Sequence, residues 1–427
     1  MSRASLREYR SMLPSRAAIL SYLTILSGSA GRLVISLVYF LIVANTLTLG
    51  EFGLFATASS TGLILSRLLA FGFVSPLYRV ATVKPRLLGA YLAGFAVLSL
   101  VSLPLIAIVA GAAYELLFAD RLAAWPFALI IVAEVVCWRP VEVVAIVNNG
   151  LRRFRQAALL VIIGSSLRTG AALLFLALGD RSLGTWAAAY LAATSISLAV
   201  ALVAFLPLAR WRFVRALYPR RMADAVFAGA ADIVFYVQSE LDKLLVLGLA
   251  GERTAGLYAI ALRVIDLTAM PVRSFNQMLV QKIMQDRGIG GGKRLAAYEA
   301  GIALVSIAGL VAVIVALKPF PGLLGHNVSA AAYLFAPMLL VPAFRNLVEY
   351  HAELLYARER TGSRIVLLCL LTALKAGLIS LVMTRFGADE GWASWMNLVF
   401  GLVYLASAGF TYRLLALRPT PALRTGP

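Results

Sequence analysis

The chain has 427 residues, of which 61% are hydrophobic and only 14% are charged. Soluble domains carry about a quarter charged residues, so this composition excludes a water-soluble protein and predicts an integral membrane protein. The net charge of +19 is compatible with a nucleic-acid partner, but the positions of the basic residues in the loops argue against one. With two cysteines and two histidines in all, we expect no disulfide framework and no metal site.

Long apolar runs separated by charged segments predict an all-α polytopic membrane protein with about twelve transmembrane helices. A run of ~18 or more apolar residues is long enough to cross a bilayer, and the first such run is too long for the core of a signal peptide. The expected helices are 17–45, 52–75, 87–114, 122–148, 156–179, 184–209, 224–250, 254–281, 295–317, 329–356, 362–386 and 390–412.

The connecting segments alternate in charge along the whole chain. One set of loops, together with both termini, carries most of the loop arginines and lysines, including the clusters at 152–155 and 210–221. The other set is short and mixed in charge. The positive-inside rule then places both termini in the cytoplasm. Because every loop is short, we expect no catalytic domain outside the membrane and no enzymatic activity.

The two halves of the sequence resemble each other. GLFA at 53–56 matches GLYA at 256–259, and VCWRPVEVV at 136–144 resembles VPAFRNLVEYH at 341–351. Repeats of this kind predict two pseudo-symmetric six-helix bundles, with the substrate site between them. We expect one bundle at 1–209, a basic cytoplasmic linker at 210–223 and a second bundle at 224–427.

Charged side chains inside the expected helices are the candidate functional residues. A charge at this depth costs at least about 2.5 kcal/mol, so each should line a cavity or pair with an opposite charge. Five basic residues have no acid within four residues on their own helix, and these are the expected anion-binding residues of a cationic cavity. They are Arg32, Arg67, Arg168, Arg273 and Lys375.

A second set of intramembrane charges serves either in ion coupling or in structural pairs. Its members are Asp232, Glu240, Asp242, Lys243, Arg263 and Asp266. Helical spacing favours the pairs Glu240–Lys243 and Arg263–Asp266. Asp242 has no such partner. It either binds a proton or a cation, as ion-coupled transport requires, or pairs with a basic residue of another helix such as Arg263 or Arg32.

The segment from Asp242-Lys243 through an outer turn to Gly256, Tyr258 and Arg263 resembles the start of the second half of a known family. This family is the polysaccharide flippases of the multidrug/oligosaccharidyl-lipid/polysaccharide (MOP) exporter superfamily, and GEFGLFA of the first half is similar to its corresponding segment. The resemblance implies a MATE-like fold of two bundles in a bacterial inner membrane. It also implies alternating access that moves undecaprenyl-diphosphate-linked oligosaccharides to the outer leaflet for O-antigen or exopolysaccharide synthesis.

The resemblance further implies a lipid-linked oligosaccharide substrate and surrounding membrane lipid. It also implies association with a polysaccharide polymerase or with glycosyltransferases. No cofactor is expected beyond H⁺ or Na⁺ as a coupling ion, and no nucleic acid.

Two other functions stay open. An ion-coupled multidrug or toxin cation antiporter of the same superfamily would favour acids over arginines in its cavity. A polysaccharide polymerase or ligase would need a substantial outer loop with catalytic residues, and His326 and His351 form no recognisable acid–base set.

Overall fold

The computed structural model describes residues 34–285, 292–320, 322–358, 360–387 and 391–416. These residues form helices and short connections, without a strand among them. Arg32 lies outside the described residues, and so does the side chain of Arg273, although its backbone is helical. The two positions therefore stay predictions.

The first half begins, within the described residues, with the helix Val34–Thr46. The helices that follow are α3 (Leu49–Ser66), a 3-10 turn (Leu69–Gly72), α4 (Val74–Val83), α5 (Leu88–Leu117), α6 (Ala124–Val132), a π-helical turn (Ala133–Trp138), α7 (Arg139–Gly150), α8 (Phe154–Leu178) and α9 (Leu183–Val200). Thr48 caps α3 by accepting the Glu51 backbone N–H, and Glu51 bonds back to the Thr48 N–H. This capping box begins the helix after a connection of only two residues, 47 and 48.

The second half contains α10 (Leu217–Gln285), α11 (Gly292–Leu317), α12 (His326–Ala331), α13 (Val341–Ala357), α14 (Thr361–Phe386) and α15 (Trp392–Ala416). Gly251, at φ 84°, divides α10 into segments 217–250 and 252–285. A residue with a Cβ is strained at this φ, so glycine permits the sharp turn between them. Helix α10 begins inside the stretch 210–223 that we expected to be linker.

Three expected helices contain irregular backbone that hydropathy does not report. The expected helix 52–75 is interrupted where Ala70, Phe71 and Gly72 all have positive φ, which is unusual for residues with a side chain. Pro140 and Pro342 each lie in the first turn of a new helix, where the missing N–H breaks no hydrogen bond. A π-helical turn precedes α7 and an irregular run of turns precedes α13, at the related segments of the two halves.

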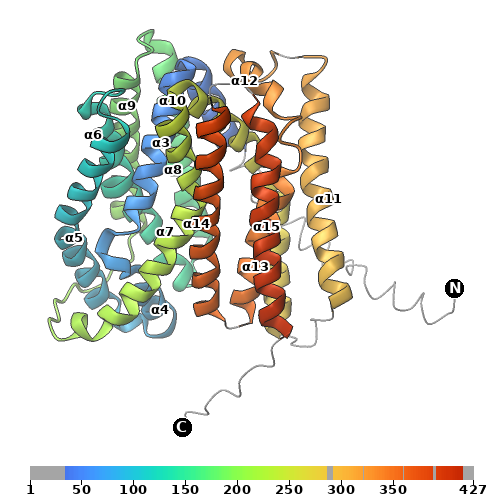
Figure 1. Ribbon diagram of the computed structural model, residues 1–427. Coiled ribbons are helices and arrows are strands. Elements are labelled where there is room, and N and C mark those ends of the chain that lie inside the picture. Colours follow the sequence, from blue (N-terminus) through green and yellow to red (C-terminus); the bar gives the residue numbers. More distant parts are fainter. Residues whose placement is uncertain (1–33, 286–291, 321, 359, 388–390, 417–427) are drawn as a thin grey trace.

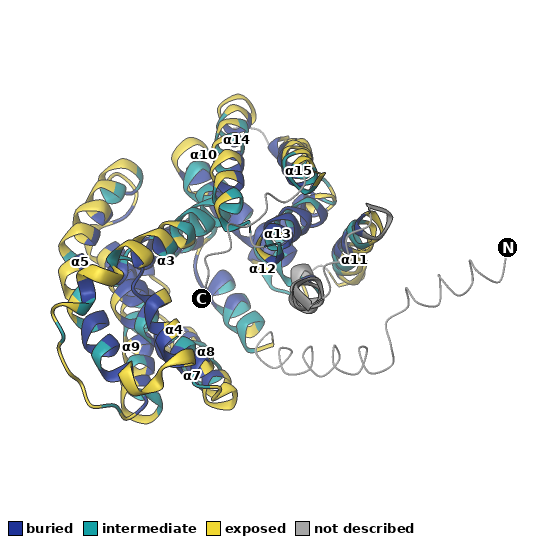
Figure 2. Cartoon of the chain, turned by 90° about the horizontal axis from the view of Figure 1, so that it is seen from below, coloured by how far each residue is buried: buried dark blue, intermediate teal, exposed yellow. Residues whose placement is uncertain are grey.

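The helices of the two halves lie side by side in Figure 1, with α5 at one edge of the molecule and α11 at the other. Seen along the helices in Figure 2, α3 to α9 lie on one side and α11 to α15 on the other. Segment 217–250 of α10 also packs against the first half. Gly229 lies so close to Gly72 that a Cβ on Gly229 would be 2.7 Å from the Gly72 Cα.

The repeated glycines contact each other directly. A Cβ on Gly53 would lie 2.6 Å from the backbone nitrogen of Gly256, and a Cβ on Gly256 would overlap the Leu49 carbonyl oxygen. The contact joins α3 to segment 252–285 of α10. The two sequence repeats therefore face one another.

Six of the described helices are long and apolar enough to cross a membrane. They are Pro85–Leu117, Phe154–Leu178, Leu183–Phe205, Leu295–Leu317, Thr361–Phe386 and Trp392–Ala416. Many of their apolar side chains point outward; Ile108 is 71% exposed and Val203 is 88% exposed. Such a surface requires lipid rather than water around it. The other expected spans are broken or carry charges inside the bundle.

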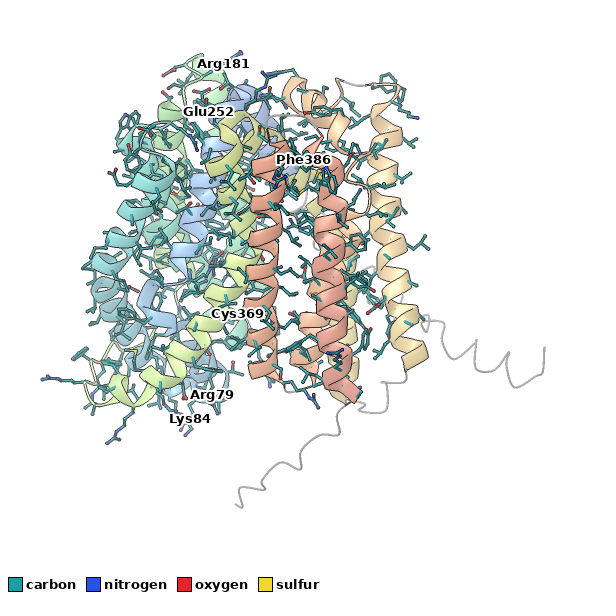
Figure 3. All side chains as sticks on the ribbon, viewed as in Figure 1. Arg79, Lys84, Arg181, Glu252, Cys369 and Phe386 are labelled. Carbon is teal, nitrogen blue, oxygen red and sulfur yellow. The ribbon has the colours of Figure 1, made fainter. Side chains whose placement is uncertain are left out.

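The ends of the molecule differ in the residues they carry. Arg79 and Lys84 lie at one end, whereas Arg181 and Glu252 lie at the opposite end (Figure 3). Arg79 and Lys84 belong to the set of loops rich in arginine and lysine, and Arg181 and Glu252 belong to the other set, so the two sets of loops lie at opposite ends of the helices.

Candidate functional site

A cavity of about 340 Å³ lies between the two halves. Its walls come from the helix Val34–Thr46, α3, the π-helical turn, α8, α9 and both segments of α10. The charged residues that line it are Arg168, Lys243, Arg263, Glu134, Glu240 and Asp266. Three basic and three acidic groups make the described lining mixed in charge, where the sequence predicted a cationic cavity.

Arg168 of α8 is held in this cavity by aromatic rings. Its guanidinium carbon lies 3.4 Å from the centroid of Trp138 and 5.1 Å from that of Tyr190. No carboxylate of the described residues lies within ion-pair distance of Arg168, and its Nε and Nη2 atoms are buried without a hydrogen-bond partner. Cation–π contact offsets part of the cost of burying the charge. These two nitrogens of the guanidinium fork are therefore not used as donors to the described protein.

Arg263, in segment 252–285 of α10, is the second guanidinium in the cavity. It donates to the Ser36 hydroxyl and lies 6.0 Å from the ring centroid of Phe40. The predicted pair with Asp266 does not form. Asp266 instead lies 3.4 Å from Nη2 of Arg345, on α13. Arg263 therefore has only neutral partners within the described part of the chain.

Glu134, in the π-helical turn, lines the same cavity as Arg168 and shares Tyr190 with it as a neighbour. It is 4% exposed and accepts hydrogen bonds from Tyr190 (2.6 Å) and Ser59 (2.7 Å). No arginine or lysine of the described residues pairs with it. Tyr190 contacts both Glu134 and Arg168, so one wall of the cavity presents an anion and a cation that are each held by neutral groups.

Glu240 and Lys243 form the predicted pair, with 2.6 Å between Lys243 Nζ and Glu240 Oε2. Ser60 of α3 donates to Glu240 (2.7 Å) and accepts from Lys243 (3.2 Å). The three residues line the cavity and connect α3 to segment 217–250 of α10. Because the two charges satisfy each other, this pair adds little net charge to the cavity.

Asp242 is fully buried and does not line the cavity. It accepts a hydrogen bond from Tyr258 (3.0 Å) and lies 3.5 Å from Arg345 and 3.6 Å from Lys375. The Lys375 ammonium, 2% exposed, also donates to the Gln238 carbonyl. Of the two alternatives for Asp242, the structure shows pairing, with cations of α13 and α14. A further cation would have to displace one of them.

Arg67 and Asp232, also predicted from sequence, lie away from the cavity. Arg67 is 4% exposed, pairs with Glu142 of α7 at 2.9 Å and stacks on Tyr236 at 3.9 Å. Glu142 also pairs with Arg139 at 3.0 Å. Asp232 is exposed and forms no ion pair with the described residues. Among the five predicted anion-binding residues, Arg168 is the one that the described cavity contains.

Sequence reasoning did not single out the neutral partners that hold Arg168 and Glu134. Trp138, Tyr190 and Ser59 are common residues of transmembrane helices and carry no charge. The signal that could have found this wall was Glu134 itself, an acid in an apolar stretch. Its partners became recognisable only once α3, α8 and α9 were packed together.

No protein-family model matches the chain, and no curated protein matches it in sequence. Solved structures match it over most of its length. An inward-facing multidrug resistance MATE family transporter of the MOP superfamily is 15% identical, with a TM-score of 0.64, over 91% of this chain and 95% of that one. The lipid II flippase MurJ in an inward closed conformation is 12% identical, with a TM-score of 0.64, over 90% of this chain and 87% of that one.

A MOP superfamily transporter from Pyrococcus furiosus is 14% identical, with a TM-score of 0.58, over 93% of this chain and 95% of that one. At these identities the likeness concerns the fold. It extends across both halves, and the similar proteins are transporters and a flippase. The chain therefore has the fold of the MOP superfamily transporters.

Proposed function

We propose that this protein is a flippase that moves an undecaprenyl-diphosphate-linked oligosaccharide from the cytoplasmic to the outer leaflet. The observation that carries the proposal is the pair Arg168 and Arg263, which face a cavity between the two halves and have no carboxylate partner among the described residues. Guanidinium groups bind phosphate oxygens through two parallel N–H donors. Two of them in one cavity suit a diphosphate.

The remaining lining fits the other part of such a head group. Tyr39, Trp138 and Tyr190 line the cavity beside Arg168, and their rings and polar atoms can contact a sugar. A cavity of about 340 Å³ is at the small end of ligand sites, which span about 300–1,000 Å³. An oligosaccharide would fill it only after the halves separate, while the lipid tail stays along the apolar outer surface.

Hydrogen bonds join the two halves at the end of the molecule at which Arg181 and Glu252 lie. Asn327 of α12 donates to the carbonyls of Ala44 (2.7 Å) and Leu47 (2.8 Å), and Asn45 donates to the Leu324 carbonyl (2.9 Å). Under the proposal this end faces outward, and both termini and the Arg79–Lys84 end face the cytoplasm of a bacterium. Transport would break these contacts and form others at the inner end.

The proposal extends to energy source and partners. A proton or sodium gradient, or the membrane potential, would drive the cycle. The product would be consumed by a polysaccharide polymerase for O-antigen or exopolysaccharide synthesis. Glycosyltransferases that build the substrate would act on the cytoplasmic side.

A reconstitution experiment tests the function. Liposomes that contain the protein and a fluorescent lipid-diphosphate oligosaccharide should expose the head group to an external quencher faster than protein-free liposomes do. Arg168→Gln should slow this about tenfold to a hundredfold, since a charge-assisted hydrogen bond contributes about 1.5–3 kcal/mol. Arg253→Gln, an exposed arginine of the outer turn, is the matched control. Equal rates with and without protein would contradict the proposal.

A cation antiporter is the second candidate, and Glu134 is the observation that favours it. This buried carboxylate lines the cavity without a basic partner in the described residues, and a cationic drug would seek such a group. Glu134→Gln should abolish proton-driven export of a cationic dye if the antiporter function is correct. It should leave diphosphate-lipid movement largely intact if the flippase function is correct.

A further inference from the structure

A second buried polar cluster lies in the second half, apart from the cavity. His351 of α13 is fully buried, and its Nε2 lies 2.7 Å from Glu299 Oε1 of α11. Its Nδ1 lies 2.9 Å from the Ser407 hydroxyl of α15. Tyr404 and Tyr412, both on α15, donate to the Glu299 carboxylate, Tyr404 at 2.9 Å. None of these residues lines the cavity between the halves.

The hydrogen bonds of this cluster allow two protonation states of the imidazole. Glu299 receives donors on both oxygens, which fits an ionised, acceptor-only carboxylate. In the neutral ring, Nε2–H donates to Glu299 and Nδ1 accepts from Ser407. After one proton is added at Nδ1, the new N–H donates to the same hydroxyl, which can reverse its role because it both donates and accepts. Every polar atom of the ring keeps a partner in either state.

Among the described side chains, Glu299 is the carboxylate that contacts His351 directly. From α10 the described side chains packed into the neighbouring core are apolar, Val272 and Phe275. From α14, Arg364 faces α13 but pairs with Glu353 at 2.8 Å. The titratable groups packed on the cluster are Tyr298, Tyr350, Tyr404 and Tyr412. Glu299 is thus the described carboxylate positioned to stabilise an imidazolium.

Helix α13 connects this cluster to the charges at the interface between the halves. His351 points toward α11 and α15, whereas Arg345, on the same helix, contacts Asp242 and Asp266 of α10. Asp266 lines the cavity. A change in how α11 and α15 hold His351 can therefore alter the position of Arg345, because a helix of this length moves as one rigid element.

We propose that His351 and Glu299 form a proton-binding site, and that proton uptake at His351 changes how α13 is held against α10. One proton from water binds Nδ1, and the positive charge is held by Glu299. The proton-binding step does not depend on the proposed function. Its consequence, a transport rate that depends on pH through α13, rests on the proposed function.

Nitrogen-15 NMR of the histidine rings tests the binding step without any substrate. The protein has only two histidines, and His326 is exposed on α12. In His326→Gln, the two ring nitrogens of His351 are therefore the only imidazole signals, and they can be followed from pH 4.5 to pH 9.5. We expect conversion from one neutral tautomer to the doubly protonated ring within this range. In Glu299→Gln, which removes the countercharge, the doubly protonated ring should be less populated than in the parent protein at the same pH. A ring that keeps one protonation state throughout would overturn the proposal.

Reconstituted protein tests the consequence, with the membrane potential clamped and a pH gradient imposed. The gradient should change head-group movement several-fold in wild type and in His326→Gln, but not in His351→Gln, which should keep its basal movement. A gradient response that persists in His351→Gln would overturn the coupling through α13. Absence of movement in wild type under every condition would instead contradict the proposed function, and the NMR titration would still decide the proton site.

Discussion

Arg168 and Lys375 occupy equivalent places in the two halves, near the middle of α8 and α14, yet their environments are opposite. Arg168 faces the cavity and has only aromatic rings around its charge. Lys375 is 2% exposed and lies 3.6 Å from Asp242. The two cations occupy equivalent positions in their helices, but the side chains around them differ. One cation is left available to a ligand, and the other is fixed inside the protein.

The residues that make this difference lie in the sequence repeats themselves. GLFA of the first half places Phe55 edge-on against Trp186 and Tyr190. GLYA of the second half places Tyr258 at the same point, and its hydroxyl donates to Asp242. A single oxygen atom distinguishes the two aromatic residues. It belongs to the network of Asp242, Arg345 and Lys375 in the second half, whereas Phe55 has no hydroxyl to donate.

The largest effect should come from Lys375→Met, which removes one of the two cations beside the buried Asp242. Breaking a buried ion pair costs about 3–5 kcal/mol, so thermal unfolding in detergent should occur at a clearly lower temperature. Arg168→Met should change the unfolding temperature little, because no described ion pair is lost.

The double variant Lys375→Met/Asp242→Asn is the control for this prediction. It removes both charges, so it should recover much of the stability lost in Lys375→Met. If Arg168→Met were as destabilising as Lys375→Met, the contrast between the two halves would be refuted.

A smaller effect is expected from Tyr258→Phe, which makes the second half resemble the first at this position. The hydroxyl donates to a charged and buried acceptor, so its loss should destabilise the protein by about 1.5–3 kcal/mol. The reverse change, Phe55→Tyr, would add a hydroxyl without a carboxylate partner. Chemical or thermal unfolding of both variants checks the prediction, and an unchanged unfolding curve for Tyr258→Phe would exclude a role for this bond.

The smallest effect is expected from Asn327→Ala, at the end of the molecule that the proposed function places outside the cell. Two hydrogen bonds to carbonyls of the other half are lost, each with a net contribution of about 1 kcal/mol. The equilibrium should shift toward states open at that end. A cysteine at Ser165, a cavity residue, should then react about threefold to tenfold faster with a membrane-impermeant thiol reagent added outside. Thr384→Ala, an exposed residue whose hydroxyl bonds only to carbonyls of its own helix, serves as control.

Hydropathy predicted an all-helical membrane protein, and six of the described helices are long and apolar enough to cross a membrane, because the length and composition of an apolar run decide whether it can lie in lipid. The breaks were harder to foresee. Positive φ at Ala70 and Phe71 arises where the chain turns to bring Gly72 against Gly229, a contact between distant segments. Nothing in LAFG itself requires it.

Charge pairs within one helix can be predicted from spacing, whereas pairs between different helices cannot. Glu240–Lys243 follows from helical spacing and is present. The pair Arg263–Asp266 satisfies the same rule, yet Asp266 lies beside Arg345 instead. Spacing reports only the partners on one helix, whereas the low-dielectric interior selects among all helices that pack together. The position of Arg67 beside Glu142 was unpredictable for this reason.

Thiol accessibility tests the central contrast most directly. In a background with Cys137 and Cys369 replaced by alanine, Arg168→Cys and Lys375→Cys would be exposed to a charged, water-soluble thiol reagent, with Ser165→Cys as a near-isosteric cavity control. Only protein that stays monodisperse in detergent would be compared. We expect Arg168→Cys to react at a rate close to that of Ser165→Cys, and Lys375→Cys to react at least tenfold more slowly. Equal rates at positions 168 and 375 would contradict the account.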